Sequence, residues 1–598
     1  MPADSKVLRI ANCSGFYGDR LAAAREMLEG GEIDFLTGDY LAELTMMILW
    51  KLRQKDPNRG YATTFLKQME DVLGLALEKG VKIVTNAGGV NPAGLANELR
   101  ALATKLGLKP KIAHIEGDNL LEKLPALQTA GHPLKHLDRG VPLSELSAMI
   151  VSANAYLGGW GIVEALNQGA DVVICPRVTD ASVVVGPAAW HFKWKRDDWD
   201  ALAGAVVAGH VVECGTQCTG GNYAFFREVP GLEHPGFPIA EMRADGSCVI
   251  TKHPGTGGLV SVGTVSAQLL YEIDGPAYFN PDVVARFDAI KLAQLGPDRV
   301  EISGVRGDPA PSSIKVCINY LGGFRNSMSF VLTGLDIEEK AKLARETLLK
   351  SLGGGKQLDS LDFELVRSDK PDPTTNTEAC ALLRVTAKSQ NPQLVGRPFS
   401  NAAVEMALSS YPGFFLTTPP GEANPYGVYW PALVPASEVE HWVVQEDGTK
   451  TAVPHTQGEN KVSDAANAAA ASRQATPSKS ESGKTRRVPL GTIIGARSGD
   501  KGGNANVGLW AASDAAYEWL AGHLTVARFR QLMPEAAELA IRRYELPNMR
   551  SLNFVIVGLL GEGVSSSTRY DAQAKGLGEF LRSKLVDIPE SLLGEQKS

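Results

Sequence analysis

The N-terminal part of the chain alternates short apolar runs with longer stretches of helical periodicity, and this alternation constrains the fold more than any other feature. Five runs have the apolar character of buried strands, at 7–12, 34–37, 82–85, 111–114 and 171–175. Helical patterns lie between them at 19–29, 41–54, 63–79 and 93–105. A repeated strand–helix order favours a parallel sheet covered by helices. The sequence therefore predicts an α/β fold for this region.

The pattern changes around residues 205–335, where glycines separate short apolar runs. These runs predict strands, and therefore a mainly β insertion, at 205–207, 211–213, 260–262, 269–273 and 315–320. A helical pattern follows at 337–352. Further along, 377–387 is typical of a strand and 399–408 of a helix, and we expect both to return to the α/β body.

A stretch of small, polar and charged residues at 456–487 marks the clearest boundary in the chain. It lacks apolar periodicity and carries too little apolar surface to offset the entropy of ordering, so it predicts a linker. The linker separates a large domain at 6–455 from a compact domain at 488–590. We expect a mostly parallel sheet flanked by helices in the large domain, and an α/β, α+β sandwich-like fold in the small C-terminal one.

The charge and hydropathy of the chain argue against several classes of partner. A net charge of -7 provides no basic field for nucleic acid or anionic lipid. The longest apolar runs, at 149–153 and 554–560, are far shorter than the roughly 20 residues of a membrane span. The first residues show no signal-peptide pattern, and the 7 dispersed cysteines are typical of reduced thiols. These features favour a cytoplasmic protein with no bound metal.

Three aspartates, Asp39, Asp118 and Asp180, each follow a different predicted strand. Because ligands meet the carboxyl ends of parallel strands, these side chains are candidate general acids or bases. A single loop aspartate is more often a helix N-cap, and that alternative stays open for each of them. Arg177 lies just before Asp180 and is a candidate for binding a substrate carboxylate in bidentate fashion.

Polar residues and glycines also follow the first and third predicted strands. In the turn at 86–92 the glycines let backbone N–H groups approach a ligand, which predicts a cradle for an anion or carboxylate. An ordinary strand-to-helix turn, with its asparagine as the helix cap, is the alternative. The candidate substrate contacts at these two strand ends are Asn12, Ser14, Tyr17, Asn86, Gly88, Gly89 and Asn91.

Two further segments are rich in reactive residue types. Cys214 is a candidate nucleophile with His210 as its base, although small residues in a glycine-rich turn are an equally good explanation. In the small domain, glycines at 496–506 accompany charged and amide side chains, which predicts a concavity for phosphate or carboxylate, with a surface hairpin as the alternative. The candidate substrate contacts there are Arg497, Asp500, Lys501 and Asn504.

Several spaced motifs together resemble the acyclic terpene utilisation AtuA family, formerly a domain of unknown function. They are Gly-Phe-Tyr-Gly-Asp-Arg at 15–20, Leu-Thr-Gly-Asp-Tyr-Leu-Ala-Glu at 36–43, Thr-Asn-Ala-Gly-Gly-Val-Asn-Pro at 85–92 and Cys-Pro-Arg-Val-Thr-Asp-Ala-Ser at 175–182. Arg-Ser-Gly-Asp-Lys-Gly-Gly-Asn at 497–504 is similar to the carboxy-terminal domain of that family. The resemblance implies a role in the breakdown of citronellol and geraniol through branched acyl-CoA thioesters, and it supplies no catalytic residues.

The resemblance, together with the candidate acids and anion contacts, implies an enzyme that acts on a branched or hydroxylated acyl-CoA thioester or related carboxylic acid by hydration, carbon–carbon cleavage or hydrolysis. One alternative is a non-catalytic acyl-binding or assembly subunit of a carboxylase or hydratase pathway, and another is a metal-dependent hydrolase. We expect no cofactor beyond coenzyme A as part of the substrate. The expected partners are the small molecule itself and further copies of the chain, because cytosolic enzymes of this size are commonly homo-oligomers.

Overall fold

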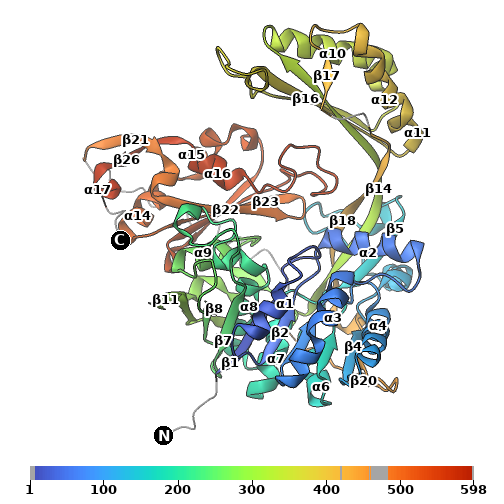
Figure 1. The fold of residues 1–598 in the computed structure, drawn as a ribbon, viewed down its shortest axis with the longest axis vertical. Helices are drawn as coiled ribbons and strands as arrows, with labels where there is room; N and C mark the ends of the chain where they lie inside the picture. The colour runs from blue at the N-terminus through green and yellow to red at the C-terminus, as the bar shows by residue number, and fades with distance from the viewer. Residues whose placement is uncertain (1–6, 418–420, 457, 459–482, 595–598) are drawn as a thin grey trace. The chain divides into compact units, whose positions relative to one another are not determined.

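The computed structural model describes residues 7–417, 421–456, 458 and 483–594. Most of the predicted linker at 456–487 lies outside these residues. The chain forms two compact units. The first comprises Met1–Asn319, Tyr429–Val564 and Gln573–Ser598, and the second comprises Tyr320–Val428 and Ser565–Ala572. Elements are labelled in Figure 1.

The first unit is built on an eleven-stranded sheet whose centre is parallel, as predicted for the N-terminal region. The five central strands follow the order β1 (Leu8–Asn12), β2 (Phe35–Gly38), β3 (Lys82–Thr85), β6 (Val172–Ile174) and β4 (Ile112–Glu116). Antiparallel strands extend both edges. On the β1 side these are β7 (Pro238–Met242), β8 (Cys248–Lys252), β12 (Arg299–Ser303) and β11 (Lys291–Gly296), and on the β4 side β19 (Trp442–Val444) and β20 (Lys450–Ala452).

Helices cover the parallel strands, and several of them are amphipathic and bury one apolar face. On α3, for example, Phe65, Met69, Val72 and Leu73 pack into the main hydrophobic core. Figure 1 shows α3 and α4 beside this part of the sheet. The helices of the region are α1 (Ala23–Glu29), α2 (Glu43–Lys55), α3 (Thr63–Glu78), α4 (Pro92–Lys105), α5 (Leu124–Thr129), α6 (Trp160–Asn167) and α7 (Ser182–Phe192).

The region predicted to be mainly β begins instead with helices, so that part of the prediction is wrong. The runs at 205–207 and 211–213 belong to α8 (Trp199–Val212), which is buried from Leu202 to its end. The runs at 260–262 and 269–273 flank and overlap α9 (Val262–Leu269), which begins with a capping box between Ser261 and Thr264. A helix buried on all sides shows no polar face, so its apolar runs cannot be told from strands.

The strand predicted at 315–320 is confirmed as part of a much longer one, β14 (Ser313–Thr333). It pairs with β5 (Ile150–Ala155), β18 (Asn424–Pro435), β16 (Cys380–Ser389) and β17 (Phe415–Leu416). The predicted strand at 377–387 and helix at 399–408 correspond to β16 and α12 (Arg397–Val404). Both belong to the second unit rather than to the α/β body. Its other main elements are α10 (Ile337–Ser351) and β15 (Ser360–Val366).

The C-terminal segment contributes an antiparallel sheet to the first unit, in the order β22 (Ile494–Lys501), β23 (Asn504–Ala511), β25 (Ser551–Ile556) and β24 (Ile541–Leu546). Helices α14 (Asp514–His523), α15 (Val526–Leu532) and α16 (Leu577–Arg582) accompany it. Phe529 and Phe554 stack in its core with ring centroids 4.4 Å apart. A second pair of strands, β21 (Thr485–Pro489) and β26 (Leu585–Pro589), completes the segment.

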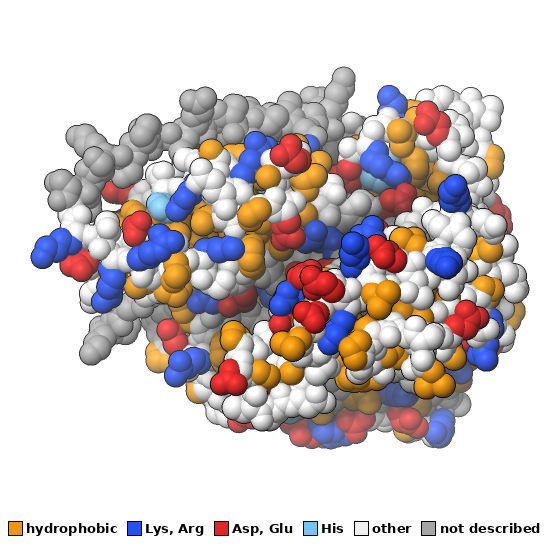
Figure 2. Space-filling model, turned by 90° about the horizontal axis from the view of Figure 1, so that it is seen from above, with side chains coloured by type: hydrophobic (Ala, Val, Ile, Leu, Met, Phe, Trp, Pro, Cys, Tyr) orange, Lys and Arg blue, Asp and Glu red, His pale blue; other side chains and the backbone are white. Residues whose placement is uncertain are grey.

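Two surface properties bear on possible partners. On the face shown in Figure 2, acidic and basic side chains are interspersed with apolar ones, so no field of a single sign dominates that face. Among the described residues, none of the helices combines the length and the apolar character that crossing a membrane requires.

Candidate active site

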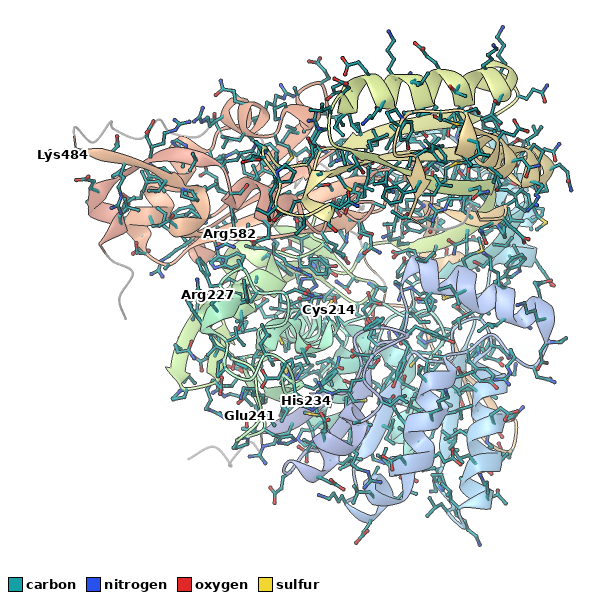
Figure 3. The ribbon with its side chains drawn as sticks, turned by 45° about the horizontal axis from the view of Figure 1, so that its top comes forward. Cys214, Arg227, His234, Glu241, Lys484 and Arg582 are labelled. Atoms are coloured by element: carbon teal, nitrogen blue, oxygen red, sulfur yellow. The ribbon has the colours of Figure 1, made fainter. Side chains whose placement is uncertain are left out.

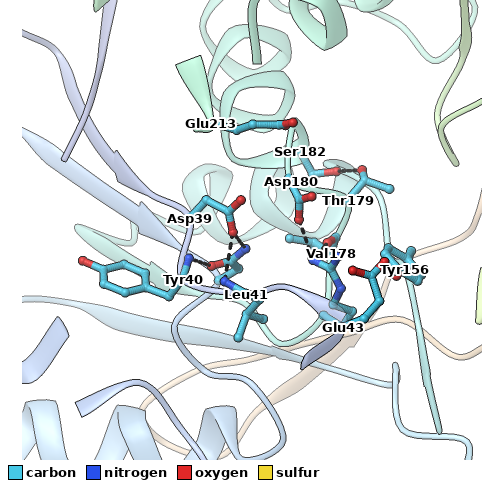
Figure 4. A network of polar contacts seen from close by, with 12 residues as sticks. Asp39, Tyr40, Leu41, Glu43, Tyr156, Val178, Thr179, Asp180, Ser182 and Glu213 are labelled. Atoms are coloured by element: carbon cyan, nitrogen blue, oxygen red, sulfur yellow. Dashed lines mark hydrogen bonds and ion pairs between the residues drawn. The ribbon is translucent and has the colours of Figure 1, made fainter. Parts of the chain in front are cut away.

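Three carboxylates from separate parts of the chain converge at the carboxyl ends of the parallel strands (Figure 4). Asp39 follows β2, Asp180 follows β6, and Glu213 immediately follows α8. Asp39 is 4% exposed, whereas the Asp180 side chain keeps 32% of its surface accessible. We call these three side chains the acid cluster. Asp180 is therefore more accessible to solvent than Asp39.

The position of Asp39 is fixed by Asn86, which is fully buried. Asn86 Nδ2 donates to Asp39 Oδ1 at 2.5 Å, and the Leu41 amide donates to the same oxygen at 3.1 Å. Asn86 Oδ1 in turn accepts from the Tyr40 amide at 2.8 Å. Asn86 thus orients an acid, and both its amide nitrogen and its amide oxygen make hydrogen bonds within the chain.

Burial and mutual repulsion make the acid cluster reluctant to ionise. Burial raises the pKa of Asp39, and the neighbouring Asp180 and Glu213 raise it further. The pKa of Glu213 is raised well above its ordinary value by burial and by Asp180, and that of Asp180 is raised by burial. Because burial disfavours each charge and neighbouring charges repel, ionisation of one carboxyl disfavours ionisation of the others, and the cluster favours a mixture of protonated and ionised groups. That is the pairing that general acid–base catalysis requires.

Arg177 supplies the positive charge that the cluster needs. Its side chain is 2% exposed, its Nη1 donates to Asp180 Oδ1 at 2.5 Å, and its guanidinium carbon lies 4.2 Å from the centre of the Tyr156 ring. Within the described part of the chain, Arg177 Nε is buried and has no hydrogen-bond partner. The candidate substrate-binding arginine is therefore largely engaged with the protein's own acid.

A second polar group adjoins Arg177 and involves residues that sequence reasoning did not single out. The Tyr156 hydroxyl donates to Glu43 Oε1 at 2.7 Å and lies 3.4 Å from the Tyr429 hydroxyl. Burial would raise the pKa of Glu43, but Lys315 and Arg177 outweigh it and lower that pKa to about 2. Glu43 is thus ionised at neutral pH and helps to balance the cations. Its place in the motif at 36–43 was the available signal.

Asp118 lies near Arg177 but outside the acid cluster. Its carboxylate accepts from Asn154 Nδ2 at 2.7 Å and from the Arg177 amide at 3.3 Å. Burial raises its pKa to about 7, although both hydrogen bonds act in the opposite direction. This geometry suits a residue that positions the strand end carrying Arg177 and Asp180.

In the turn after β3, the two glycine amides that the predicted anion cradle depends on donate to carbonyls of the chain itself. The Gly88 amide donates to Cys175 O and the Gly89 amide to Asn86 O. Asn91 caps α4 by accepting from the Gly94 amide at 3.0 Å, with Pro92 at the first helical position. The N–H groups are satisfied by the chain itself, so the alternative of a strand-to-helix turn describes this segment.

The residues after β1 also make internal contacts. Asn12 Nδ2 donates to Val212 O at 2.8 Å, and its Oδ1 accepts from the Ser14 amide at 2.6 Å. Ser14 Oγ donates to Phe16 O, and the Tyr17 ring packs against the hydrophobic core. Asn12 therefore connects the end of β1 to the end of α8, immediately before Glu213.

His210 and Cys214 do not form the predicted nucleophile–base pair. His210 Nδ1 lies 3.2 Å from Glu213 Oε1, and its ring packs 5.1 Å from the Tyr278 ring. Burial and Lys501 lower the pKa of His210 to about 4, so its imidazole is neutral at pH 7. Burial and Glu213 raise the pKa of the Cys214 thiol, which stays protonated. The base thus faces a carboxylate while the thiol is unactivated.

The hairpin β22–β23 brings the small-domain candidates to the same part of the first unit. Lys501 stabilises the charge of Glu213 and lies with its ammonium 5.7 Å from the centre of the Tyr278 ring. Asp500 lies 3.6 Å from Lys575, and burial raises its pKa to about 7. Asn504 makes structural contacts, since its Nδ2 donates to Asp138 Oδ1 at 2.8 Å.

Arg497 and Arg582 attach the C-terminal segment to the rest of the first unit. Arg497 donates to Gln217 Oε1 and stacks 4.5 Å from the centre of the Tyr271 ring. Arg582, labelled in Figure 3, donates to Ala224 O at 2.8 Å, with its guanidinium carbon 4.7 Å from the centre of the Phe225 ring.

We expect Arg497→Ala to loosen this attachment and to lower the melting temperature by about 1–2 °C. The cation–π contact and the hydrogen bond together account for roughly 1–2 kcal/mol. Differential scanning fluorimetry measures the change. Arg306→Ala, which removes an arginine side chain that is 72% exposed, serves as the control and should leave the melting temperature unchanged. Equal melting temperatures for Arg497→Ala and the wild type would contradict the anchoring role.

Comparison with protein families gives two matches that together span most of the chain. The model described as "Acyclic terpene utilisation family protein AtuA" matches residues 8–445. The model described as "AtuA ferredoxin-like domain" matches residues 488–587. No curated protein and no solved structure matches the chain.

Proposed function

Since the chain belongs to the acyclic terpene utilisation family AtuA, we propose that it is a catabolic enzyme that transfers protons to and from a branched or hydroxylated acyl group. The single observation that carries this proposal is the convergence of Asp39, Asp180 and Glu213 beside Arg177. A free acid or its coenzyme A thioester, as the family resemblance implies, would present the carbonyl that such chemistry needs.

Addition or removal of water and cleavage of a carbon–carbon bond are the reaction classes that this arrangement suits best. In each, a base takes one proton from the substrate and an acid returns one to it, which a half-protonated set of carboxyls can do in place. Hydrolysis through a cysteine nucleophile is less well supported, because Cys214 stays protonated and His210 faces Glu213.

The residues have distinct roles in this proposal. Asp180 is the most accessible carboxyl and meets the substrate first, while Asp39 and Glu213 hold or release the second proton. The guanidinium of Arg177 balances the negative charge of Asp180 when that carboxyl is ionised. Asn86 and Asp118 act as positioning residues, since each hydrogen-bonds a member of the cluster or the backbone that carries one.

The proposal is tested by incubating the protein with a panel of branched, unsaturated and 3-hydroxylated acyl-CoA thioesters and their free acids in deuterated water. Stabilising ligands are found first by thermal shift, because binding to the native state raises stability. Mass spectrometry then follows deuterium incorporation and product formation. We expect at least one thioester both to bind and to exchange or react. Binding without any exchange across the panel would support a non-catalytic acyl-binding protein instead.

A further inference from the structure

Lys315 is a lysine near the start of β14 whose ammonium faces aromatic rings rather than a carboxylate. Its Nζ lies 5.1 Å from the centre of the Tyr156 ring and 5.6 Å from that of Tyr429. Among the described residues, no carboxylate oxygen lies within 4.0 Å of this ammonium. Glu43 acts on it only from a greater distance, because its own short contact is with the Tyr156 hydroxyl.

The ammonium of Lys501, at the end of β22, likewise faces an aromatic ring rather than a carboxylate. Its Nζ lies over the Tyr278 ring, and the described part of the chain offers no carboxylate oxygen within 4.0 Å of it. The next residue, Gly502, has φ +62, and a Cβ atom placed there would lie 3.5 Å from Asp138 Oδ2 and 3.9 Å from the Tyr429 ring. The hairpin tip therefore lies against the tyrosine whose ring Lys315 also faces.

The two ammonium groups repel one another. Burial lowers the pKa of Lys315, and the positive charge of Lys501 is the next largest contribution in the same direction. Glu43 and Asp274 favour the charge of Lys315, but burial and Lys501 outweigh them, so a cationic Lys315 costs free energy in the unliganded protein. A bound anion would remove that cost, and the electron-rich tyrosine rings would hold the cations in place until it arrives.

We propose that Lys315 and Lys501 together bind an oxyanion, a carboxylate or a phosphate of the substrate, and hold it beside the acid cluster. The buried Arg177 Nε–H is a further donor without a partner in the described residues. Placement of the substrate beside Asp180 and Glu213 rests on the proposed function, but the binding of the anion does not. The two statements can therefore fail separately.

The test measures the binding of three probes to the full chain by isothermal titration calorimetry: glutarate, inorganic phosphate and coenzyme A. The variants are Lys315→Met and Lys501→Met, with Lys315→Arg as the charge-retaining variant. Lys105→Met removes a lysine of α4 that is 71% exposed and serves as the matched control. Circular dichroism verifies that every variant is folded, and if Lys315→Met fails that check, Lys501→Met carries the comparison.

We expect the wild type to bind at least one probe, Lys315→Met and Lys501→Met each to bind it at least tenfold more weakly, and Lys105→Met to bind it unchanged. Lys315→Arg should retain most of the affinity. Preference for glutarate over phosphate identifies the carboxylate as the ligand group, and preference for coenzyme A or phosphate identifies the phosphate. The proposal is overturned, even if turnover is found, if the wild type binds none of the three probes. It is also overturned if both methionine variants bind the probe as tightly as the wild type does.

Discussion

Asp39→Asn is expected to lower kcat by at least about a hundredfold while leaving the protein folded. A positioned general acid or base contributes roughly 10²–10⁴-fold to rate, and an amide at this position cannot exchange the proton. Folding is preserved because an asparagine Oδ1 can still accept from Asn86 Nδ2 and from the Leu41 amide, as the carboxylate does. The measurement is steady-state turnover of the substrate identified in the acyl-CoA panel, with circular dichroism as the folding check.

Glu213→Gln tests a second member of the acid cluster and is likewise expected to lower kcat. Its loss should also move the pH–rate profile, because Glu213 raises the pKa of Asp39 and its removal returns that pKa toward its ordinary value. The acidic limb of kcat is thus expected to shift to lower pH, a change that a purely structural residue would not produce.

Asp282→Asn is the matched control for both variants. Asp282 is also buried, and burial raises its pKa to about 6, but its carboxylate accepts from the Gly159 amide at 2.6 Å at the start of α6. It belongs to a different part of the first unit's hydrogen-bond network, so turnover should match the wild type. Unchanged turnover in Asp39→Asn and Glu213→Gln as well would reject the acid–base mechanism.

Asp118→Asn is expected to stabilise the protein at alkaline pH. Burial raises the pKa of Asp118 from 3.8 to about 7, so the folded state binds its proton more tightly than the unfolded state does. The stability associated with this group is therefore complete below pH about 4 and is lost as the pH rises through about 7. A difference of about three pH units corresponds to about 4 kcal/mol at pH 8, and the substitution removes that penalty.

The measurement is the melting temperature of the wild type and of Asp118→Asn between pH 4 and pH 8. The variant should melt at a higher temperature at pH 8, and the difference should nearly vanish at pH 4. Asp71→Asn provides a control of opposite sign, because the Arg25 hydrogen bond lowers the pKa of Asp71, which is largely exposed. Its loss should cost a little stability above pH 4. A pH-independent difference between Asp118→Asn and the wild type would contradict the assigned cause.

The parallel core of the fold could be predicted from sequence because each of its strands is a short apolar run bounded by turns. The same rule failed for α8, whose buried face is continuous around the helix. Glu213 could therefore not be predicted as a site residue, since its position depends on where α8 ends. Asp39 and Asp180 could be predicted as site residues because parallel strands present their carboxyl ends at one edge of the sheet.

Other members of the candidate site could not be reached from local pattern. Lys315 lies in an apolar strand, and nothing in its neighbours indicates that Tyr156 and Tyr429 will face it. Conversely, the amide side chains of Asn86 and Asn91 predict contacts with a substrate, but in the structure they make hydrogen bonds within the chain. Sequence identifies residue types capable of binding, whereas the partners of each side chain depend on the folded arrangement of the segments.

The attachment of the β22–β23 hairpin near the acid cluster has a consequence for how the chain is synthesised. Asp39, Asp180 and Glu213 leave the ribosome well before Lys501, whose charge favours ionisation of Glu213 in the finished protein. A chain that ends before residue 488 lacks the positive charge of Lys501, although it retains that of Arg177. In the complete protein, the segment after residue 488 thus contributes a charge that acts on the acid cluster as well as a sheet of the first unit.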